Sequence, residues 1–454
     1  MQDNERTPKK RRRVTVFRVI MVLLLVAGCA FAIFRLSLRS KLKARIDAIR
    51  AAGYPVTCAE LDKWYTTPED AKNAAYIILD AFEYYQKPQD SELLPLLGKA
   101  ELPARNIPLT KETENIIAQY LSDNQKTLEM LHEAAALEHG RYLVDLSFDL
   151  APPVMNRVKG VKLLNLEAII HAEKNESQSA IRSLTSSLGL AKSFSEEPII
   201  VSQLSRISCQ ARTVSILERV MNRTDLTDEQ LADLSQAVAN AQEQSSLGIS
   251  RAFVGERCQT LSVFRKPGSL AGIVIGSHGQ TSDIPVPILE VYKALGLADM
   301  DAVDYLDMMK GYIKATQLPP HLRQEAVEAV KPKRESIPKT RILLRTFMPA
   351  LDRIITMDLR NIAGLRTAQA AIAIQRYRLA TGKFPETLND LVPDYLELVP
   401  TDPFDGKELR YKKLETGYFV YSIGEDLSDD GGKEKPPRRT KESPNWDVTF
   451  IVER

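Results

Sequence analysis

An uninterrupted run of sixteen apolar residues, Val19 to Phe34, lies near the amino terminus. As a helix, this run would rise about 24 Å, which is short of the roughly 30 Å hydrocarbon core of a bilayer. Extension back to Val14, with the guanidinium of Arg18 reaching the surface, gives 21 residues and a rise of about 31 Å. The sequence therefore predicts a single-pass transmembrane signal anchor at 14–34, preceded by a basic tail at 1–13.

Basic residues lie on both sides of the apolar run. Seven Lys or Arg precede it within residues 6–18, and six follow it within residues 35–50. The positive-inside rule therefore favours, by a small margin, a cytoplasmic amino terminus, with the bulk of the chain outside the inner membrane. Residues 51–454 hold 48 basic and 56 acidic residues, so the body has no positive excess and a nucleic-acid partner is not expected.

Two other interpretations of this region stay open. The segment Pro8–Val14, PKKRRRV, resembles a nuclear localisation signal, although a basic cluster directly before an apolar span is more simply a topology signal. The segment Val26–Cys29, VAGC, resembles the lipobox of bacterial lipoproteins, in which Cys29 would be lipidated. Against this, Ala30–Phe34 continue the apolar run where such proteins usually turn polar.

The other cysteines are Cys58, Cys209 and Cys258. They contain no Cys-x-x-Cys pair and no metal-like spacing to a histidine. Unpaired thiols are therefore favoured over a disulfide, and the disulfide state stays open.

Residues 35–340 are expected to form an all-α body. Amphipathic windows recur at helical spacing, and local signals mark helix starts: Thr67 is a candidate N-cap, and Thr227 with Gln230 has the spacing of a capping box. Glycines and prolines break the helical pattern at 265–287, which predicts a loop.

One helical pair is predicted within residues 161–198. Four of its residues have the spacing at which a tetratricopeptide helix pair places its packing side chains: Leu164, Ala168, Ala180 and Leu184. No second copy follows at the repeat spacing, so we interpret the segment as a helical hairpin and not as part of a repeat array.

No catalytic constellation is recognised in the sequence. The five histidines lack zinc-like spacing, and no phosphate-binding glycine loop is present. Neighbouring carboxylates occur at Glu196 and Glu197, and Glu256 stands beside Arg257, but adjacent positions on a helix do not face each other, so surface solvation is the favoured role. We therefore expect no enzymatic activity, no catalytic or cofactor-binding residues and no small-molecule substrate. An extracytoplasmic hydrolase that uses these carboxylates is the alternative.

Residues 341–454 have a different pattern. A long helix is predicted to end at Gly382, and Pro385 forbids its continuation. A turn with Pro403 and Gly406 follows, and then two strands joined at Glu415–Gly417. The final segment alternates, which predicts a strand with one apolar face: Trp446, Val448, Phe450 and Val452. The expected fold class is thus mainly α, with a C-terminal α+β module.

This order of elements, with the motifs YRLATGKFPETLNDL, LVPTDPFDG and YFVYSIGEDLSDDGG, resembles the C-terminal globular domain of the major pseudopilins of type II secretion systems. The resemblance covers about residues 361–454 and implies a long helix on a small antiparallel sheet, with calcium bound before the last strand. The family's N-terminal assembly device is missing, since no acidic residue lies between Arg6 and Ile46. The whole chain also resembles large membrane-anchored proteins of planctomycete-type bacteria.

The corresponding loop here is acidic. Asp426, Ser428 and Asp430, followed by Gly431, have the spacing of the first ligands of an EF-hand loop, and Asp429 is a further candidate. The bidentate Glu that would complete an EF-hand is replaced by proline. Calcium binding and a solvated acidic turn are both compatible with this pattern.

Three functions follow as expectations. The first is a non-enzymatic, membrane-anchored envelope protein with a helical interaction body and a calcium-stabilised module. The second is an accessory of a type II secretion-like apparatus, with envelope or secretion proteins as partners. The third is the hydrolase.

Overall fold

The computed structural model describes residues 8–65, 73–137, 139–142, 146, 154–266, 274–275, 280–281, 285–348, 351–434 and 446–454. Within these residues the chain is mainly helical, with one small three-stranded antiparallel sheet, as the sequence predicts. The first helices are α1 (Pro8–Ala51), α2 (Cys58–Trp64), α3 (Ala74–Ala81), α4 (Lys111–Asp123), α5 (Gln125–Ala135), α6 (Val154–Glu173), α7 (Ser177–Lys192), α8 (Ile200–Arg223) and α9 (Asp228–Arg265).

The later helices are α10 (Val286–Ala294), α11 (Leu297–Thr316), α12 (Pro320–Glu328), α13 (Lys331–Glu335), α14 (Ile342–Phe347), α15 (Leu351–Thr381) and the short 3-10 helix η2 (Leu388–Leu391). The strands are β1 (Val274–Ile275), β2 (Gln280–Thr281), β3 (Arg410–Lys413), β4 (Tyr418–Ser422) and β5 (Val448–Val452). The two-residue pair β1–β2 falls inside the predicted loop 265–287. Other described residues of 35–340 form helices and connecting segments.

The chain forms two compact units. Unit 1 comprises Met1–Val56, Thr260–Asp307 and Ile337–Phe347, and unit 2 comprises Thr57–Gln259, Met308–Ser336 and Met348–Arg454. The sequence-based division at 34/35 and 340/341 stays a prediction.

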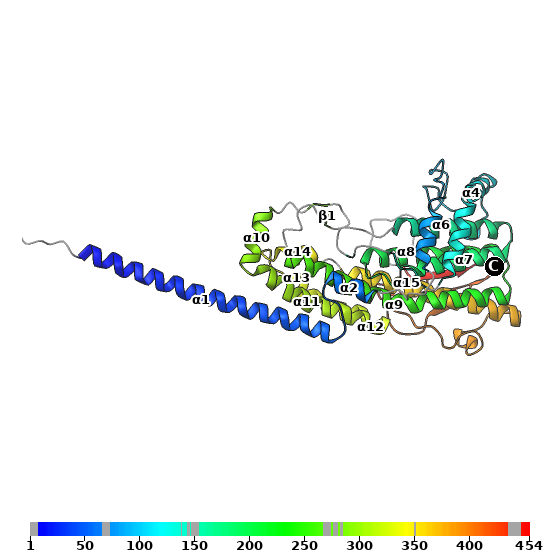
Figure 1. The fold of residues 1–454 in the computed structure, drawn as a ribbon. Coiled ribbons are helices and arrows are strands. Elements are labelled where there is room, and N and C mark those ends of the chain that lie inside the picture. The colour runs from blue at the N-terminus through cyan, green and yellow to red at the C-terminus, as the bar shows by residue number, and fades with distance from the viewer. Residues whose placement is uncertain are drawn as a thin grey trace, which may run out of the picture. The chain divides into compact units, whose positions relative to one another are not determined.

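In unit 1, α1 is one long continuous helix (Figure 1), and its exposure changes at Arg35. Every residue from Val16 to Phe34 is exposed, and within the described residues α1 is the one helix long and apolar enough to cross a membrane. Beyond Phe34 the helix packs against α11: Leu38 is buried, Arg35 pairs with Asp299 at 3.1 Å, and Arg45 donates two hydrogen bonds to Asp307. One continuous helix therefore contains an exposed apolar stretch and a docked stretch.

The interior of unit 1 is organised around a buried carboxylate on α11. Asp301 is fully buried and accepts hydrogen bonds from the Tyr292 hydroxyl at 2.6 Å and from the Leu344 amide at 3.0 Å, and it pairs with Arg341. Tyr292 lies on α10, and Leu344 lies on α14. Because a buried charge requires partners, this cluster fixes α10 and α14 to α11.

In unit 2, α6 and α7 form the predicted helical hairpin. The four predicted packing residues are all fully buried: Leu164, Ala168, Ala180 and Leu184. At Gly189 a side chain would collide with the backbone carbonyl of Ala135, so glycine allows α7 and α5 to approach closely.

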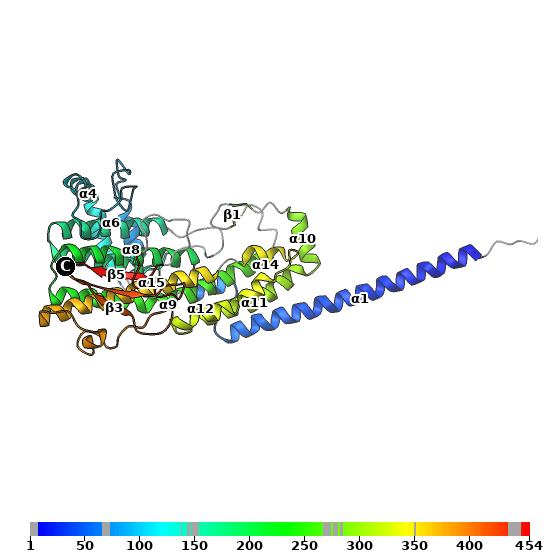
Figure 2. The ribbon, with the colours of Figure 1, turned by 180° about the vertical axis from the view of Figure 1, so that it is seen from behind.

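The C-terminal elements share a hydrophobic core with the helices of unit 2. Strands β3, β4 and β5 form the sheet in that order, with Val420 opposite Phe450 and Tyr418 opposite Val452. The Tyr418 hydroxyl donates to the Ala371 carbonyl of α15 at 2.7 Å. Figure 2 shows β5 beside α8 and α15, which both contact it.

Several local predictions are confirmed. Thr227 and Gln230 form the capping box through two reciprocal hydrogen bonds of 3.0 and 3.2 Å. Gly382 and Gly406 adopt the positive φ values of 75° and 74° that end the long helix and close the turn. The predicted N-cap Thr67 lies outside the described residues.

Candidate functional site

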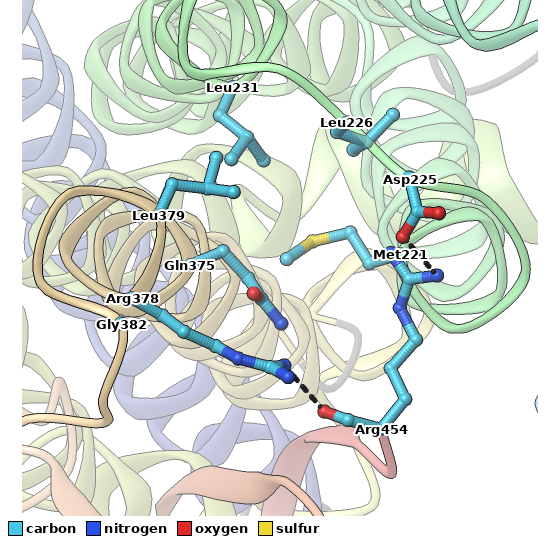
Figure 3. Close-up of a pocket in the computed structure, with 9 residues that line it drawn as sticks. All are labelled: Met221, Asp225, Leu226, Leu231, Gln375, Arg378, Leu379, Gly382 and Arg454. Carbon is cyan, nitrogen blue, oxygen red and sulfur yellow. Dashed lines mark hydrogen bonds and ion pairs between the residues drawn. The ribbon is translucent and has the colours of Figure 1, made fainter.

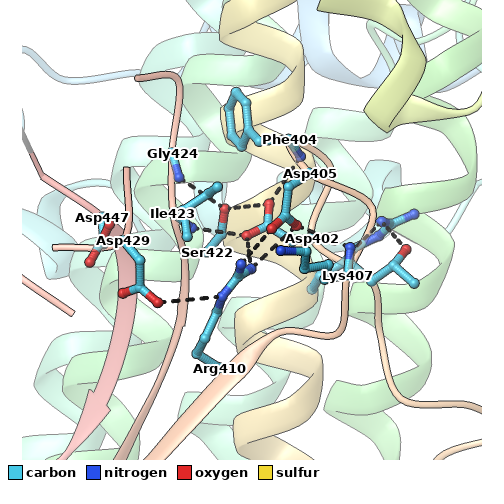
Figure 4. Close-up of polar contacts among 12 residues, drawn as sticks. Asp402, Phe404, Asp405, Lys407, Arg410, Ser422, Ile423, Gly424, Asp429 and Asp447 are labelled. Atoms are coloured by element: carbon cyan, nitrogen blue, oxygen red, sulfur yellow. Dashed lines mark hydrogen bonds and ion pairs between the residues drawn. The ribbon is translucent and has the colours of Figure 1, made fainter. Parts of the chain in front are cut away.

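The candidate site lies in the C-terminal module, where two acidic turns meet the sheet (Figure 4). The first is the turn of the motif LVPTDPFDG, and its centre is the fully buried Asp402. The Asp402 carboxylate accepts hydrogen bonds from the Ser422 hydroxyl at 2.8 Å, from the Ile423 amide at 2.9 Å and from the Phe404 amide at 3.0 Å. Asp402 thus joins the turn to the end of β4.

Arg410, at the start of β3, supplies the positive charge for this turn. Its guanidinium donates to Asp402 at 2.7 Å and to Asp405 at 2.5 Å. Burial acts to raise the pKa of Asp405, but the hydrogen bonds from Arg410 and from the Lys407 amide outweigh it, so this pKa lies below its usual range. The first turn therefore carries an internal cation.

The second turn contains the predicted calcium ligands. Asp426 accepts a hydrogen bond from the Ser428 amide at 3.2 Å, and Asp429 accepts one from the Gly431 amide at 3.0 Å. Both are exposed, as is Ser428. The half-buried Asp430 differs from them, because its Oδ2 atom is buried without a hydrogen-bond partner.

A further carboxylate, Asp447, faces this loop from the start of the last strand. It is 2% exposed, and its Oδ2 accepts a hydrogen bond from the Gly432 amide at 2.6 Å. Its Oδ1 is buried without a partner. Burial raises the pKa of Asp447 above its usual range, and the Asp429 carboxylate adds to this effect. Arg410 lies 3.9 Å from Asp429, but the loop keeps two buried carboxylate oxygens without hydrogen-bond partners, on Asp430 and Asp447.

These features fit a hard cation in part. Calcium prefers carboxylate and carbonyl oxygens, and two buried carboxylate oxygens, on Asp430 and Asp447, lack protein partners. Among the described residues, however, no three His, Cys, Asp or Glu side chains lie close enough together to hold a metal ion by themselves. Backbone carbonyls or water would have to complete the coordination shell. Position 437, where the EF-hand glutamate would stand, lies outside the described residues.

Sequence reasoning missed Asp447. The alternation of the last strand places it on the face opposite Val448 and Phe450, where a polar residue needs no explanation. Its proximity to Gly432 depends on the path of the chain before β5, and no local pattern reports that path.

A serine, a histidine and a glutamate also meet in unit 2. His132 on α5 lies 2.7 Å from the Ser186 hydroxyl on α7 and 2.8 Å from Glu167 on α6, and Glu167 also accepts from Ser183 at 2.7 Å. Burial acts to raise the pKa of Glu167, but the bonds from His132 and Ser183 outweigh it and lower that pKa.

This trio resembles a nucleophile, base and orienting acid. Ser186 also lines a groove of about 550 Å³. However, Ser186 lies inside α7, where backbone amides bond to the carbonyls of their own helix and do not form an oxyanion hole. The arrangement is better explained as a polar tie among three helices.

The carboxylates considered for a hydrolase are separated in the structure. Glu197 is fully buried and pairs at 2.8 Å with the fully buried Arg157, whose guanidinium lies over Phe194. Glu196 lies at the surface, 3.8 Å from Arg251. Glu256 is half-buried on α9. Glu196 and Glu197 therefore lie in different environments and do not form an acid/base pair.

A cavity of about 600 Å³ lies between α8, α9 and α15 (Figure 3). Arg378 donates to the Arg454 carbonyl at 2.8 Å, and Arg454 pairs with Asp225 at 3.2 Å. The nine lining residues contain neither a nucleophilic hydroxyl or thiol nor a pair of carboxylates: Met221, Asp225, Leu226, Leu231, Gln375, Arg378, Leu379, Gly382 and Arg454. The cavity thus provides no support for a hydrolytic reaction.

Comparisons with protein-family models, with curated proteins and with solved structures found no match to this chain.

Proposed function

We propose that this chain is a single-pass membrane protein without enzymatic activity, located in the cytoplasmic membrane with its amino terminus inside and its body outside. The observation that supports this most is the exposed stretch Val16–Phe34 of α1. Apolar surface in water costs about 25 cal/mol per Å². Insertion into a bilayer removes this cost, while the docked part of α1 connects the anchor to unit 1.

Extraction of membranes with alkaline carbonate tests the anchor. The parent chain should stay in the pellet. Leu23→Glu with Leu24→Glu should release it, because each carboxylate at the centre of a span costs about 3 kcal/mol. Ser37→Glu with Ser40→Glu is the matched control, since both serines are exposed on the same helix beyond the apolar stretch. Release of the parent chain would refute the anchor.

Protease treatment of intact spheroplasts tests the orientation. With the proposed topology, externally added protease digests the body and leaves a short fragment that carries an amino-terminal tag. Digestion of the tag together with protection of the body would reverse the orientation.

We propose in addition that residues 361–454 form a pseudopilin-like module that binds calcium. The packing of α15 on a three-stranded sheet and the unpartnered oxygens of Asp430 and Asp447 support this proposal. Bound calcium would neutralise these two carboxylates and connect the loop to the last strand. Calorimetric titration of the full chain with calcium should give one binding event that Asp430→Asn with Asp447→Asn abolishes.

The alternative role, as an accessory of a type II secretion-like apparatus, is supported by one free sheet edge. The outer edge of β5 is covered, because Glu218 and Asn222 of α8 accept from the Ile451 and Glu453 amides at 2.7 Å each. Within the described residues β3 pairs with β4 alone. The charged side chains of β3 disfavour pairing of this edge with unrelated strands.

Photo-crosslinking in membranes from position 412 on β3 tests this alternative. Capture of secretion-apparatus proteins would establish an accessory role. Capture limited to other envelope proteins would indicate that the module shares the pseudopilin-like fold without a role in secretion.

The hydrolase alternative is tested at the serine nearest to a catalytic geometry. A fluorophosphonate probe labels activated serines, so we expect no labelling of Ser186 in the parent chain. Labelling that is lost in both Ser186→Ala and His132→Ala would overturn the non-enzymatic proposal.

A further inference from the structure

Helix α10 of unit 1 has an apolar face that the described part of the chain leaves exposed. Ile288, Val291 and Leu295 are 52%, 58% and 49% exposed, and their spacing of three and four residues places them on one side of the helix. Leu289 and Tyr292 are buried on the adjacent side, which faces α11 and α14. The apolar surface of α10 is thus wider than the part that unit 1 covers.

The polar residues of α10 are on a different side. Glu290 and Lys293 are exposed, and their positions lie away from the stripe of Ile288, Val291 and Leu295. A soluble helix usually presents polar residues opposite its buried stripe. Here the exposed apolar stripe adjoins the buried side and lies roughly opposite Glu290 and Lys293, so α10 has an uncovered apolar face and a polar face, as helices that lie in a membrane interface do.

The position of α10 relative to the anchor identifies what covers this stripe. The apolar run of α1 ends at Phe34, and the next residue, Arg35, pairs with Asp299 just after α10. At Gly296, which follows α10 directly, a side chain would collide with Arg35. The carboxyl end of α10 therefore lies at the level where α1 leaves the hydrocarbon layer, and Figure 1 shows α10 crosswise to α1.

We infer that α10 is an interfacial helix that inserts Ile288, Val291 and Leu295 into the lipid surface next to the anchor. This inference depends on the proposed membrane anchor. The occupant of the stripe is the bilayer itself, because Arg35 brings the carboxyl end of α10 to the end of the apolar run of α1, where Leu36 is also 66% exposed. Exposed Arg39, on the next turn of α1, is placed to meet lipid phosphates.

Fluorescence quenching on the full chain tests this inference. The protein is reconstituted into vesicles of phosphatidylethanolamine and phosphatidylglycerol, with an environment-sensitive dye on one cysteine at a time. Natural Cys29, exposed within the apolar stretch of α1, reports on the anchor. In a Cys29→Ser, Cys58→Ser background, Ile288→Cys and Val291→Cys report on the stripe, and Lys293→Cys is the matched control on the same helix. Cys209 and Cys258 are buried and stay unlabelled.

The quenchers are nitroxides placed deep or shallow in the lipid, and aqueous iodide. We expect deep quenching at position 29, shallow lipid quenching at positions 288 and 291 that is at least about twofold stronger than at 293, and iodide quenching at 293. Iodide quenching at 288 and 291, with position 29 deep, would overturn the inference and leave the anchor intact. Protection of 288 and 291 from both quenchers would mean that protein covers them and would also overturn it. Iodide quenching at position 29 would overturn the anchor and this inference together.

Discussion

The two acidic turns of the C-terminal module differ in how the protein compensates their buried carboxylates. The turn around Asp402 has an internal cation, Arg410, and each oxygen of Asp402 has protein partners. In the loop before the last strand, Asp430 and Asp447 each keep one buried oxygen without a partner. Arg410 also reaches the second loop, where it lies 3.9 Å from Asp429, but it leaves the unpartnered oxygens of Asp430 and Asp447 uncompensated.

The charge compensation of the first turn is part of the fold, whereas that of the second would come from a bound ligand. An arginine held by the fold compensates charge at all times, whereas a diffusible cation compensates charge only when it is present. A folded protein usually satisfies its buried polar groups, so a group left unsatisfied needs an explanation. A bound calcium ion would explain the unpartnered oxygens of Asp430 and Asp447. The turn around Asp402, which the protein satisfies by itself, is the comparison within the same module.

The largest effect is expected from Asp402→Ala. The change leaves Arg410 half-buried with fewer partners and leaves the Ser422 hydroxyl and the Ile423 amide without their acceptor. Breaking a buried ion pair by removing one partner costs about 3–5 kcal/mol. Hydrogen exchange at the end of β4 should therefore become much faster.

Asp405→Ala is the control for this prediction, because Asp405 is half-buried and Arg410 would keep Asp402. Equal losses of protection in the two variants would show that Asp402 has no special role.

A smaller effect is expected from calcium. At a calcium concentration 100 times the dissociation constant, binding should stabilise the folded chain by about 2.7 kcal/mol. Thermal melting with calcium and with EDTA measures this difference. Asp430→Asn with Asp447→Asn should remove it, whereas Glu415→Gln in the exposed hairpin should keep it. A parent melting temperature indifferent to both additions would exclude a calcium-stabilised loop.

The charge compensation of Glu218 lies between these two cases. Glu218 has a cationic partner, Arg105, but shares it with Glu434 and Glu453. Burial raises its pKa from 4.5 to about 7. Because the folded state holds this proton more tightly, the stabilisation is complete below pH 4.5 and is lost as pH rises to about 7. The loss should be roughly 3 kcal/mol.

Urea unfolding in EDTA between pH 5 and 8 measures this loss. Glu218→Gln keeps an acceptor for the Ile451 amide and removes the titration, so its stability should depend less on pH. Identical pH dependence in parent and variant would assign the effect to another group.

The smallest effect is expected from Lys412→Met. Lys412 donates from β3 to the Gly431 carbonyl at 3.0 Å and is exposed. Removing it should cost no more than about 0.5 kcal/mol without calcium. The same change removes a positive charge beside the acidic loop, so calcium should bind slightly more tightly. Calcium titration of both proteins measures this difference, and weaker binding in the variant would contradict the proposed location of the cation.

The sequence predicts the elements of the module better than their contacts. Gly382, Gly406 and the Thr227–Gln230 capping box mark boundaries because they act through neighbouring backbone. The pairing of Arg410 with Asp402 and the position of Asp447 depend on how β3, β4 and β5 are brought together, which no local pattern encodes. The EF-hand-like spacing identified Asp430 because its ligands are neighbours in the sequence. It could not identify Asp447, which approaches the loop only in the folded chain.

Helix α1 shows the same limit on a larger scale. Its length and apolar run can be read directly from the sequence. Its pairing with Asp299 and Asp307, more than 250 residues away, cannot be read in this way. The uncovered stripe of α10 is likewise visible only when Leu289 and Tyr292 are known to be buried.

The continuity of α1 has a mechanical consequence. The helix runs without interruption from its exposed apolar stretch into the stretch that Arg35 and Arg45 clamp to α11. These clamps are ten residues apart, or about 15 Å along the axis. Two fixed points on a stiff rod transmit rotation as well as displacement. In the proposed membrane-anchored state, a change in the tilt of α1 caused by bilayer thickness or lateral tension would therefore act on unit 1 as a torque.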